Sequence, residues 1–247
     1  QLARDLVKEV RESLLKRECS VFFHLKLTTQ QILAKDSDTD IRTQLAAYPK
    51  LSPSVQKLLA EDKSVIVRQA LAKGSEDWPH LSLNEEIQRL LARDCDINVR
   101  LALAENGRLS PEALILLASD VNTSVKIKLI EESLHHHLPL QVQRTLAKDP
   151  DAEVRKALAR RLFGFLPPPS SEEIHLILAN DQDEEVRDTI VFSVTSPLAI
   201  ARGKCSAAVK ARLLEGASDT TRERLETVKT SLVEVAIDIL RERNHCE

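Results

Sequence analysis

Aspartates and cations recur through this chain at one fixed separation, and both residue types can take part in chemistry. Six times the sequence repeats a phrase of Leu, Ala, one variable residue and Asp, and a cation preceded by Val or Ile follows each Asp after six residues. A row of carboxylates could supply general acids, and a row of cations could bind phosphate groups. The six pairs are Asp36 and Arg42, Asp62 and Arg68, Asp94 and Arg100, Asp120 and Lys126, Asp149 and Arg155, and Asp181 and Arg187.

We expect these pairs to have a structural role. An Asp in the turn before a helix can accept hydrogen bonds from the free N–H groups of the first helical turn, and its charge suits the positive end of that helix. The cation six residues later can reach the Asp of its own or the next unit, so charge-assisted bonds would form a ladder along the chain. Replacing Asp94 by Ala should then cost about 0.5–2 kcal/mol of stability, as for the loss of a cap.

Other metal-binding or catalytic groups are weakly represented. His135, His136 and His137 could offer imidazoles to a metal, but adjacent side chains diverge and no Cys or carboxylate follows at ligand spacing, so we predict a solvated loop and no metal. The sequence has no GxSxG, no glycine-rich phosphate loop and no HExxH. The cysteines form no CxxC pair, which indicates reduced thiols in a cytoplasmic protein; they are Cys19, Cys95, Cys205 and Cys246. We therefore expect no cofactor and no catalysis.

The composition favours helices and narrows the class of partner. Five Gly, few aromatic residues and 43% hydrophobic residues argue against dinucleotide-binding and all-β folds. The net charge of −3, from 35 Lys and Arg against 38 Asp and Glu, makes nucleic acid an unlikely partner because no cationic field exists. The sequence contains no run of about 18 apolar residues, so we expect no membrane-spanning helix.

The residues around each pair predict two short helices per unit. An apolar residue stands one position before each cation and another stands three positions after it, so the second helix buries one stripe. Start signals such as Ser52-Pro53 and Ser110-Pro111 predict a first helix before the Asp. Helices of about ten residues are too short to persist alone, so neighbouring units must stack.

These phrases carry a family resemblance. The stretch from Asp36 to Arg42 resembles the HEAT-type helical repeat, and the stretches Asp40 to Pro53 and Val99 to Pro111 resemble more narrowly the bacterial leucine-rich repeat variant (LRV), whose repeats alternate an α-helix with a 3₁₀ helix. The resemblance runs from Leu2 to about Leu225, and it implies a structural role for the Asp and Arg residues. The described LRV protein holds an iron–sulfur cluster on clustered N-terminal cysteines, but only Cys19 lies in that region here, so we expect no cluster.

We predict an all-α protein whose 247 residues form a single domain, a right-handed α-solenoid of about eight HEAT-like or LRV-like repeats. Residues 1–24 would form a partial first repeat, 25–192 the regular repeats, and 193–247 a degenerate repeat with a C-terminal capping helix. Because Leu2 begins within a repeat phrase, we expect the first helix of that unit to be absent or to lie upstream. The segments 163–169 and 193–206 interrupt the pattern and are predicted to be loops that could carry specificity.

The position after each cation is the candidate for partner binding, because it should lie on the less buried flank of the second helix, which lines the concave face of HEAT-like stacks. Polar residues at the ends of this series flank two aliphatic residues in its middle, which would form a hot spot if exposed and would belong to the core if buried. The candidate partner-binding residues are Gln69, Leu101, Ile127 and Lys156. We therefore expect a monomeric, non-catalytic scaffold that binds a protein partner; the alternatives are a HEAT-like nucleic-acid-binding or DNA-repair protein and a HEAT-like lyase.

Overall fold

The computed structural model describes residues 2–16, 25–48, 50–74, 83–133, 138–161, 172–195, 215 and 218–223, with only the backbone of 172 and 192–195. Every regular element in these ranges is a helix and none is a strand, which confirms the prediction of an all-α chain for the described residues. The chain divides into two compact units, Gln1–Thr145 and Leu146–Glu247. The single domain expected from the sequence stays a prediction.

The first unit begins with a 3₁₀ turn, η1, and continues as a series of short helices. They are η1 (Leu2–Arg4), α1 (Lys8–Lys16), α2 (Leu27–Leu33), α3 (Thr39–Ala46), α4 (Pro53–Ala60), α5 (Val65–Lys73), α6 (Glu85–Leu91), α7 (Ile97–Ala104), α8 (Pro111–Ala118) and α9 (Thr123–Glu132). Helix α10 (Leu140–Ala147) crosses the division between the units. The second unit contains α11 (Ala152–Arg161), α12 (Glu172–Ala179) and α13 (Glu184–Thr195), and one helical turn at 219–223.

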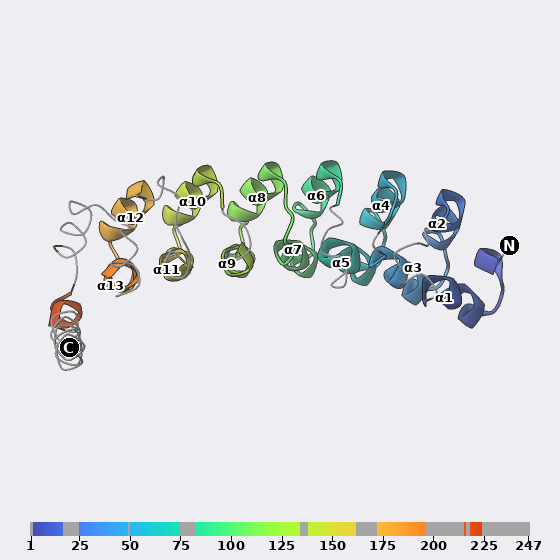
Figure 1. Cartoon of the computed structure of the whole chain (residues 1–247), viewed down its shortest axis with the longest axis horizontal. Helices are drawn as coiled ribbons and strands as arrows, with labels where there is room; N and C mark the ends of the chain where they lie inside the picture. The colour runs from blue at the N-terminus through green and yellow to red at the C-terminus, as the bar shows by residue number, and fades with distance from the viewer. Residues whose placement is uncertain are drawn as a thin grey trace, which may run out of the picture. The chain divides into compact units, whose positions relative to one another are not determined.

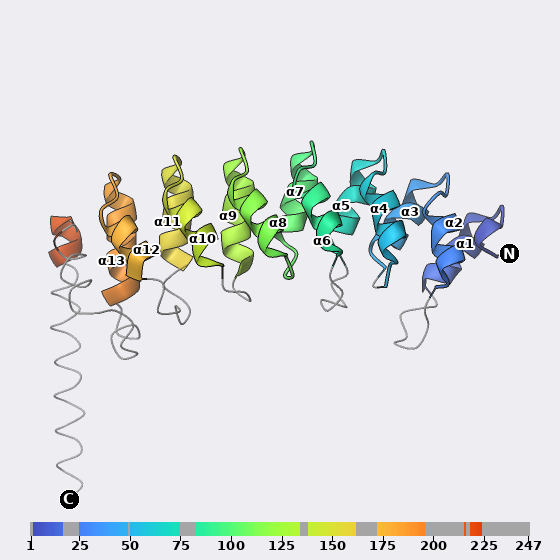
Figure 2. The same ribbon diagram turned by 90° about the horizontal axis from the view of Figure 1, so that it is seen from above.

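The helices of the first unit lie in two rows (Figure 1). One row contains α2, α4, α6 and α8, and the other contains α1, α3, α5, α7 and α9. Consecutive helices pack as pairs, α2 on α3, α4 on α5, α6 on α7 and α8 on α9, and Figure 2 shows these pairs following one another along the unit. Within the second row α3, α5, α7 and α9 also pack against their neighbours, so each pair of helices covers the apolar stripe of the next.

The repeated phrase supplies the core. The Leu that opens the phrase is fully buried at Leu33, Leu59, Leu91 and Leu117. The predicted stripe on the second helix is confirmed, because the residue before each cation is fully buried in α3, α5, α7 and α9, and the residue three positions after it is at most 2% exposed. The second unit repeats the arrangement: α11 packs on α13 and α12 on α13, with the same positions buried. Local spacing therefore decided which face of each helix is buried.

Proline fixes where two first helices begin. Helices α4 and α8 start at Pro53 and Pro111, and in α8 the Ser110 side chain accepts a hydrogen bond from the Ala113 N–H at 3.3 Å. Proline suits the first helical position because its missing N–H would have no partner there. The predicted start signals Ser52-Pro53 and Ser110-Pro111 are thus confirmed, and they place residue 56 and residue 114 at the same point of their helices.

Candidate functional site

In five units an arginine binds the aspartate of the following unit with two hydrogen bonds. Arg42 donates from Nε to Asp62 Oδ2 at 2.7 Å and from Nη2 to Asp62 Oδ1 at 3.2 Å. The same fork of two donors joins three further pairs in the first unit and one in the second, which shows that the ladder links successive helix pairs. These further pairs are Arg11 with Asp36, Arg68 with Asp94, Arg100 with Asp120, and Arg155 with Asp181.

The same guanidinium also holds the turn of its own unit. Arg68 Nη1 donates to the main-chain carbonyl of Asp62 at 2.8 Å, and the Asp62 carboxylate accepts from the N–H of Ser64 at 2.8 Å. The phrase Asp is therefore not the helix cap, which corrects the expected role. The cap is the residue two positions later, and its side chain accepts an N–H of the first turn in three second helices; these caps are Asp38, Asp96 and Asn122.

The paired arginine and aspartate side chains of the ladder are largely buried. The side chains of Arg42 and Asp62 are 5% and 7% exposed. Burial alone would raise the pKa of Asp62 and Asp94, but hydrogen bonds from the arginine and from a main-chain N–H outweigh it and hold each pKa below its ordinary value. These carboxylates are held in the charged form by the arginine and the main-chain N–H, an arrangement typical of structural ion pairs.

Three ladder residues lie where the pattern changes. Lys126 replaces arginine in α9 and is buried. Asp149 is buried as well; its main-chain carbonyl accepts from Arg155 Nη1 at 2.7 Å and its carboxylate accepts from the N–H of Asp151. Arg187 Nη1 donates to the Asp181 carbonyl at 2.8 Å, so it holds its own turn as the other arginines do.

The structure places three of the four predicted binding residues on one row of the first unit. Gln69 on α5 is exposed, and Leu101 on α7 and Ile127 on α9 are half-buried. Lys156 belongs to α11 in the second unit, where its side chain is 11% exposed and its ammonium lies 2.5 Å from both Glu153 and Glu185. The hydrogen bonds to these two carboxylates raise the pKa of Lys156.

Residues three positions earlier on the same helices extend this surface. Ile66, Asn98 and Ser124 are exposed, and residues i and i+3 share one face of a helix. Sequence reasoning missed these three positions, although the helical period of the predicted residues could have indicated them. We call the six residues together the uncharged band; they are Ile66 and Gln69 on α5, Asn98 and Leu101 on α7, and Ser124 and Ile127 on α9.

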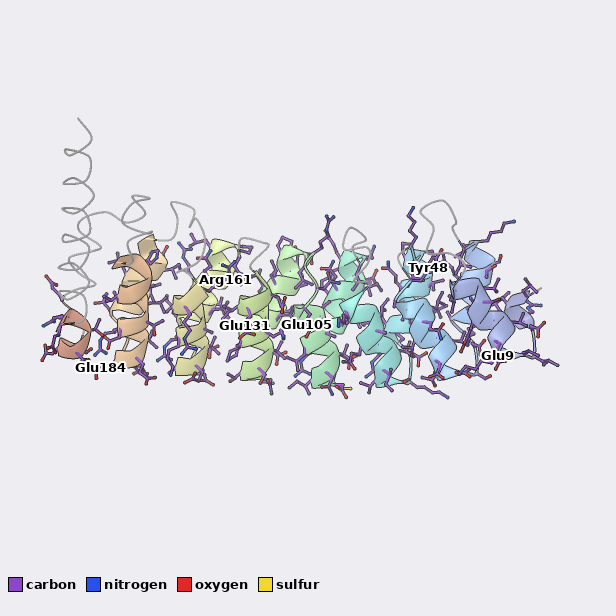
Figure 3. All side chains as sticks on the ribbon, turned by 60° about the horizontal axis from the view of Figure 1, so that its bottom comes forward. Glu9, Tyr48, Glu105, Glu131, Arg161 and Glu184 are labelled. Carbon is purple, nitrogen blue, oxygen red and sulfur yellow. The ribbon has the colours of Figure 1, made fainter. Side chains whose placement is uncertain are left out.

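Charged networks border the uncharged band within the first unit. At the α1 and α3 end, Lys8 forms ion pairs with Asp38 at 3.0 Å and with Asp40 at 2.5 Å, and these carboxylates raise the pKa of Lys8. Near the carboxyl ends of α7 and α9, Lys128 lies 3.5 Å from Glu105 and 3.6 Å from Glu132. Figure 3 shows the side chains of this row, with Glu9, Glu105 and Glu131 labelled on its helices.

A second ladder, made of glutamines, joins the other row and was missed by sequence reasoning. Gln30 Nε2 donates to the carbonyls of Leu25 and Lys50, both at 3.0 Å, and its Oε1 accepts from the N–H of Ser52 at 3.0 Å. Gln88 makes all three equivalent bonds, and Gln56 makes two of them, to the Leu51 carbonyl and from the Asn84 N–H, so each amide ties its own unit to the loop before the next first helix. A Gln at the fourth position of α2, α4, α6 and α10 was the available signal.

The glutamine ladder is interrupted at α8, where the fourth position is Leu114. The residue before α10 is Pro139, which has no N–H to donate to a glutamine. A pocket of about 390 Å³ lies at this point of the first unit. Its wall includes Leu109, Leu114 and Leu138, together with Arg108 and Glu132.

Several predicted features fall wholly or partly outside the described residues. These are His135 to His137, the loop 163–169, residues 196–206 of the second interruption, the final helix, and three of the cysteines. The prediction of a loop from residue 193 is wrong for residues 193–195, because α13 continues through Thr195. Cys95 is exposed and forms no disulfide, and the Tyr48 hydroxyl accepts a hydrogen bond from the Leu25 N–H at 3.3 Å.

Among residues with a described position, no group of three or more His, Cys, Asp or Glu could hold a metal ion. No helix in the described ranges is long and apolar enough to cross a membrane. Neither a protein-family model nor a curated protein matches this chain.

Proposed function

We propose that this chain is a non-catalytic scaffold that binds an extended segment of a partner protein along the uncharged band. In this proposal the helix pairs belong to a right-handed solenoid of about eight HEAT-like, LRV-like units, and the partner lies across α5, α7 and α9. The observation that carries the proposal is the exposure of the band: Ile66 is 61% exposed and stands beside exposed carboxamides. Protein-binding surfaces combine apolar contacts with hydrogen-bonding groups, and the band offers both.

The chemistry of the band suits a polypeptide backbone. Gln69 and Asn98 each carry a carboxamide that can donate and accept at once, as the peptide N–H and C=O groups of an extended segment require. Ile66, Leu101 and Ile127 offer apolar contacts for the side chains of that segment. Because the band has no charge of its own, the charged networks on its borders would set where a partner's charged residues can lie.

The cations of the row favour a protein partner over a nucleic acid. Arg42, Arg68 and Arg100 each use their guanidinium on an aspartate and a main-chain carbonyl, so these donors are engaged in the free protein. Phosphate binding depends on clustered Lys and Arg side chains that can neutralise the backbone. Lys156 stays a candidate in the second unit, where a partner carboxylate would have to replace Glu153 or Glu185.

A double substitution tests the proposal. Leu101→Asp with Ile127→Asp places two carboxylates in the half-buried middle of the band, and we expect loss of the partner because each charge would be desolvated on binding. The matched control is Leu90→Asp, which alters a 42% exposed leucine on α6 in the other row. Proteins captured by the wild type should be identified, purified and titrated against all three forms, with circular dichroism to confirm equal helix content.

The outcomes separate the possible functions. A purified protein bound by the wild type and by Leu90→Asp, but not by the double variant, supports the proposal. Binding that the double variant retains would place the partner elsewhere and contradict it. Recovery of nucleic acid in place of protein would favour the alternative function.

A further inference from the structure

The interrupted glutamine ladder leaves one main-chain acceptor without its usual donor. In four units the carbonyl five residues before the glutamine accepts a hydrogen bond from its Nε2; these carbonyls belong to Leu25, Leu51, Leu83 and Leu138. Leu109 holds the corresponding place before Leu114, whose side chain has no donor. No hydrogen bond to the Leu109 carbonyl is formed in the described part of the chain. Leu109 is half-buried, and an acceptor shielded from water favours a donor that can reach it.

The pocket of about 390 Å³ provides access to this position. Leu109 and Leu114 line it together with the buried residues Leu129 and Leu138, so most of its wall is apolar. The other glutamines reach the equivalent carbonyl from the fourth position of their helices, which is the position of Leu114. The pocket therefore combines leucine side chains with one main-chain acceptor, an arrangement typical of small-molecule sites.

We propose that this pocket binds a small apolar molecule that carries a primary carboxamide, whose NH₂ group donates to the Leu109 carbonyl. The protein already makes this contact in other units, because Gln30 and Gln88 place their own carboxamides against the corresponding carbonyls at 3.0 and 2.9 Å. This inference is independent of the proposed scaffold function, since the pocket residues lie outside the uncharged band.

The pocket wall also carries one charge of each sign, Arg108 and Glu132, so an ionised ligand of either sign would meet one attraction and one repulsion. A neutral amide has no charge to desolvate on entering a mostly apolar pocket, and this favours a neutral donor over an ionised one. Its carbonyl oxygen receives no main-chain donor from Pro139, so the recognition depends on the N–H groups.

Two probes of nearly equal size test the hydrogen bond. Benzamide and acetophenone differ only in an NH₂ group against a CH₃ group beside the same carbonyl. Titrated into the full chain and followed by amide chemical shifts of Leu109, Leu114 and Ser133, benzamide should bind saturably and about three- to tenfold more tightly than acetophenone, as one net hydrogen bond requires. Equal affinities for the two probes, or no saturable shift with benzamide, would overturn the proposal.

Substitutions at the pocket provide the second test. Leu114→Gln places the protein's own carboxamide against the Leu109 carbonyl and should abolish benzamide binding, whereas Leu58→Gln, the same change at a 37% exposed site on α4, should leave it unchanged. Circular dichroism checks that each variant keeps its helix content. Should Leu114→Gln not fold, Leu114→Phe fills the pocket and should also abolish binding. Benzamide affinity that survives in a folded pocket variant would refute the site.

Discussion

The two rows of helices in the first unit are joined by ladders of different chemistry. In the row of α3, α5 and α7, a charged arginine links an aspartate of the next unit to a carbonyl of its own. In the row of α2, α4 and α6, a neutral glutamine links carbonyls and an N–H of the loops. The arginine ladder uses an Asp side chain and a carbonyl, whereas the glutamine ladder also needs a main-chain N–H, which a proline lacks. At α8 the glutamine ladder has Leu114 in place of glutamine and Pro139 in place of the N–H donor, and the pocket lies there.

The largest effect should come from breaking the charged ladder. Asp94→Ala would leave Arg68, 12% exposed, without its carboxylate, and we expect a loss of about 3 kcal/mol because a buried charge then lacks its partner. This value exceeds the cost of a lost cap, which the sequence alone suggested. The matched control in the same turn is Asp96→Ala, which removes the cap bond to the Asn98 N–H but keeps the ion pair of Arg68 with Asp94, and it should cost about 1 kcal/mol. Urea unfolding followed by circular dichroism measures both, and equal losses would contradict the distinction.

Breaking the neutral ladder should have a smaller effect. Gln88→Leu removes donors from the carbonyls of Leu83 and Arg108 and leaves the N–H of Ser110 without its acceptor, which should cost about 2 kcal/mol. The same urea unfolding experiment measures this loss. A variant as stable as the wild type would show that the glutamine amides contribute nothing to the stacking of units.

Restoring the missing glutamine at position 114 should show whether Pro139 causes the interruption. Leu114→Gln alone should not stabilise the protein, because Pro139 offers no N–H to the new Oε1. Combined with Pro139→Ala, the glutamine gains that donor, and a double-mutant cycle should give a favourable coupling of about 1 kcal/mol. Additive effects of the two changes would mean that proline is not the cause of the interruption.

The smallest expected effect is in the pH dependence of the free energy of unfolding, which should differ between the two ladders. The pKa of Asp94 is lowered in the folded protein, so its ion pair contributes fully above the unfolded pKa of about 3.9 and loses its contribution as the pH falls through the lower folded value. The stability difference between wild type and Asp94→Asn should therefore be constant from pH 7 to 5 and shrink below about pH 4. The difference for Gln88→Leu should not change over this range, since no titrating group is involved; parallel pH curves for the two variants would contradict this assignment.

Local features of the sequence were sufficient for the helices and their buried faces. The spacing of the phrase placed Leu59 and Leu91 in the core, and Pro53 and Pro111 marked the first residues of their helices. Such features depend on neighbours within one or two helical turns, so a periodic sequence determines them before any packing occurs. The residues of the charged ladder were predictable for the same reason.

The tertiary structure alone decided which groups meet between units. Arg42 could reach Asp36 or Asp62, and only the stacking of helix pairs made Asp62 its partner, 20 residues away. The glutamine ladder and the pocket depend on loops whose lengths vary, so their geometry follows from the approach of successive pairs and not from any local spacing. The sequence by itself thus determined the helices of each unit and their buried faces. The packing between units determined the partners of the ladder residues and the position of the pocket, because contacts between residues distant along the chain form only after the short helices stack.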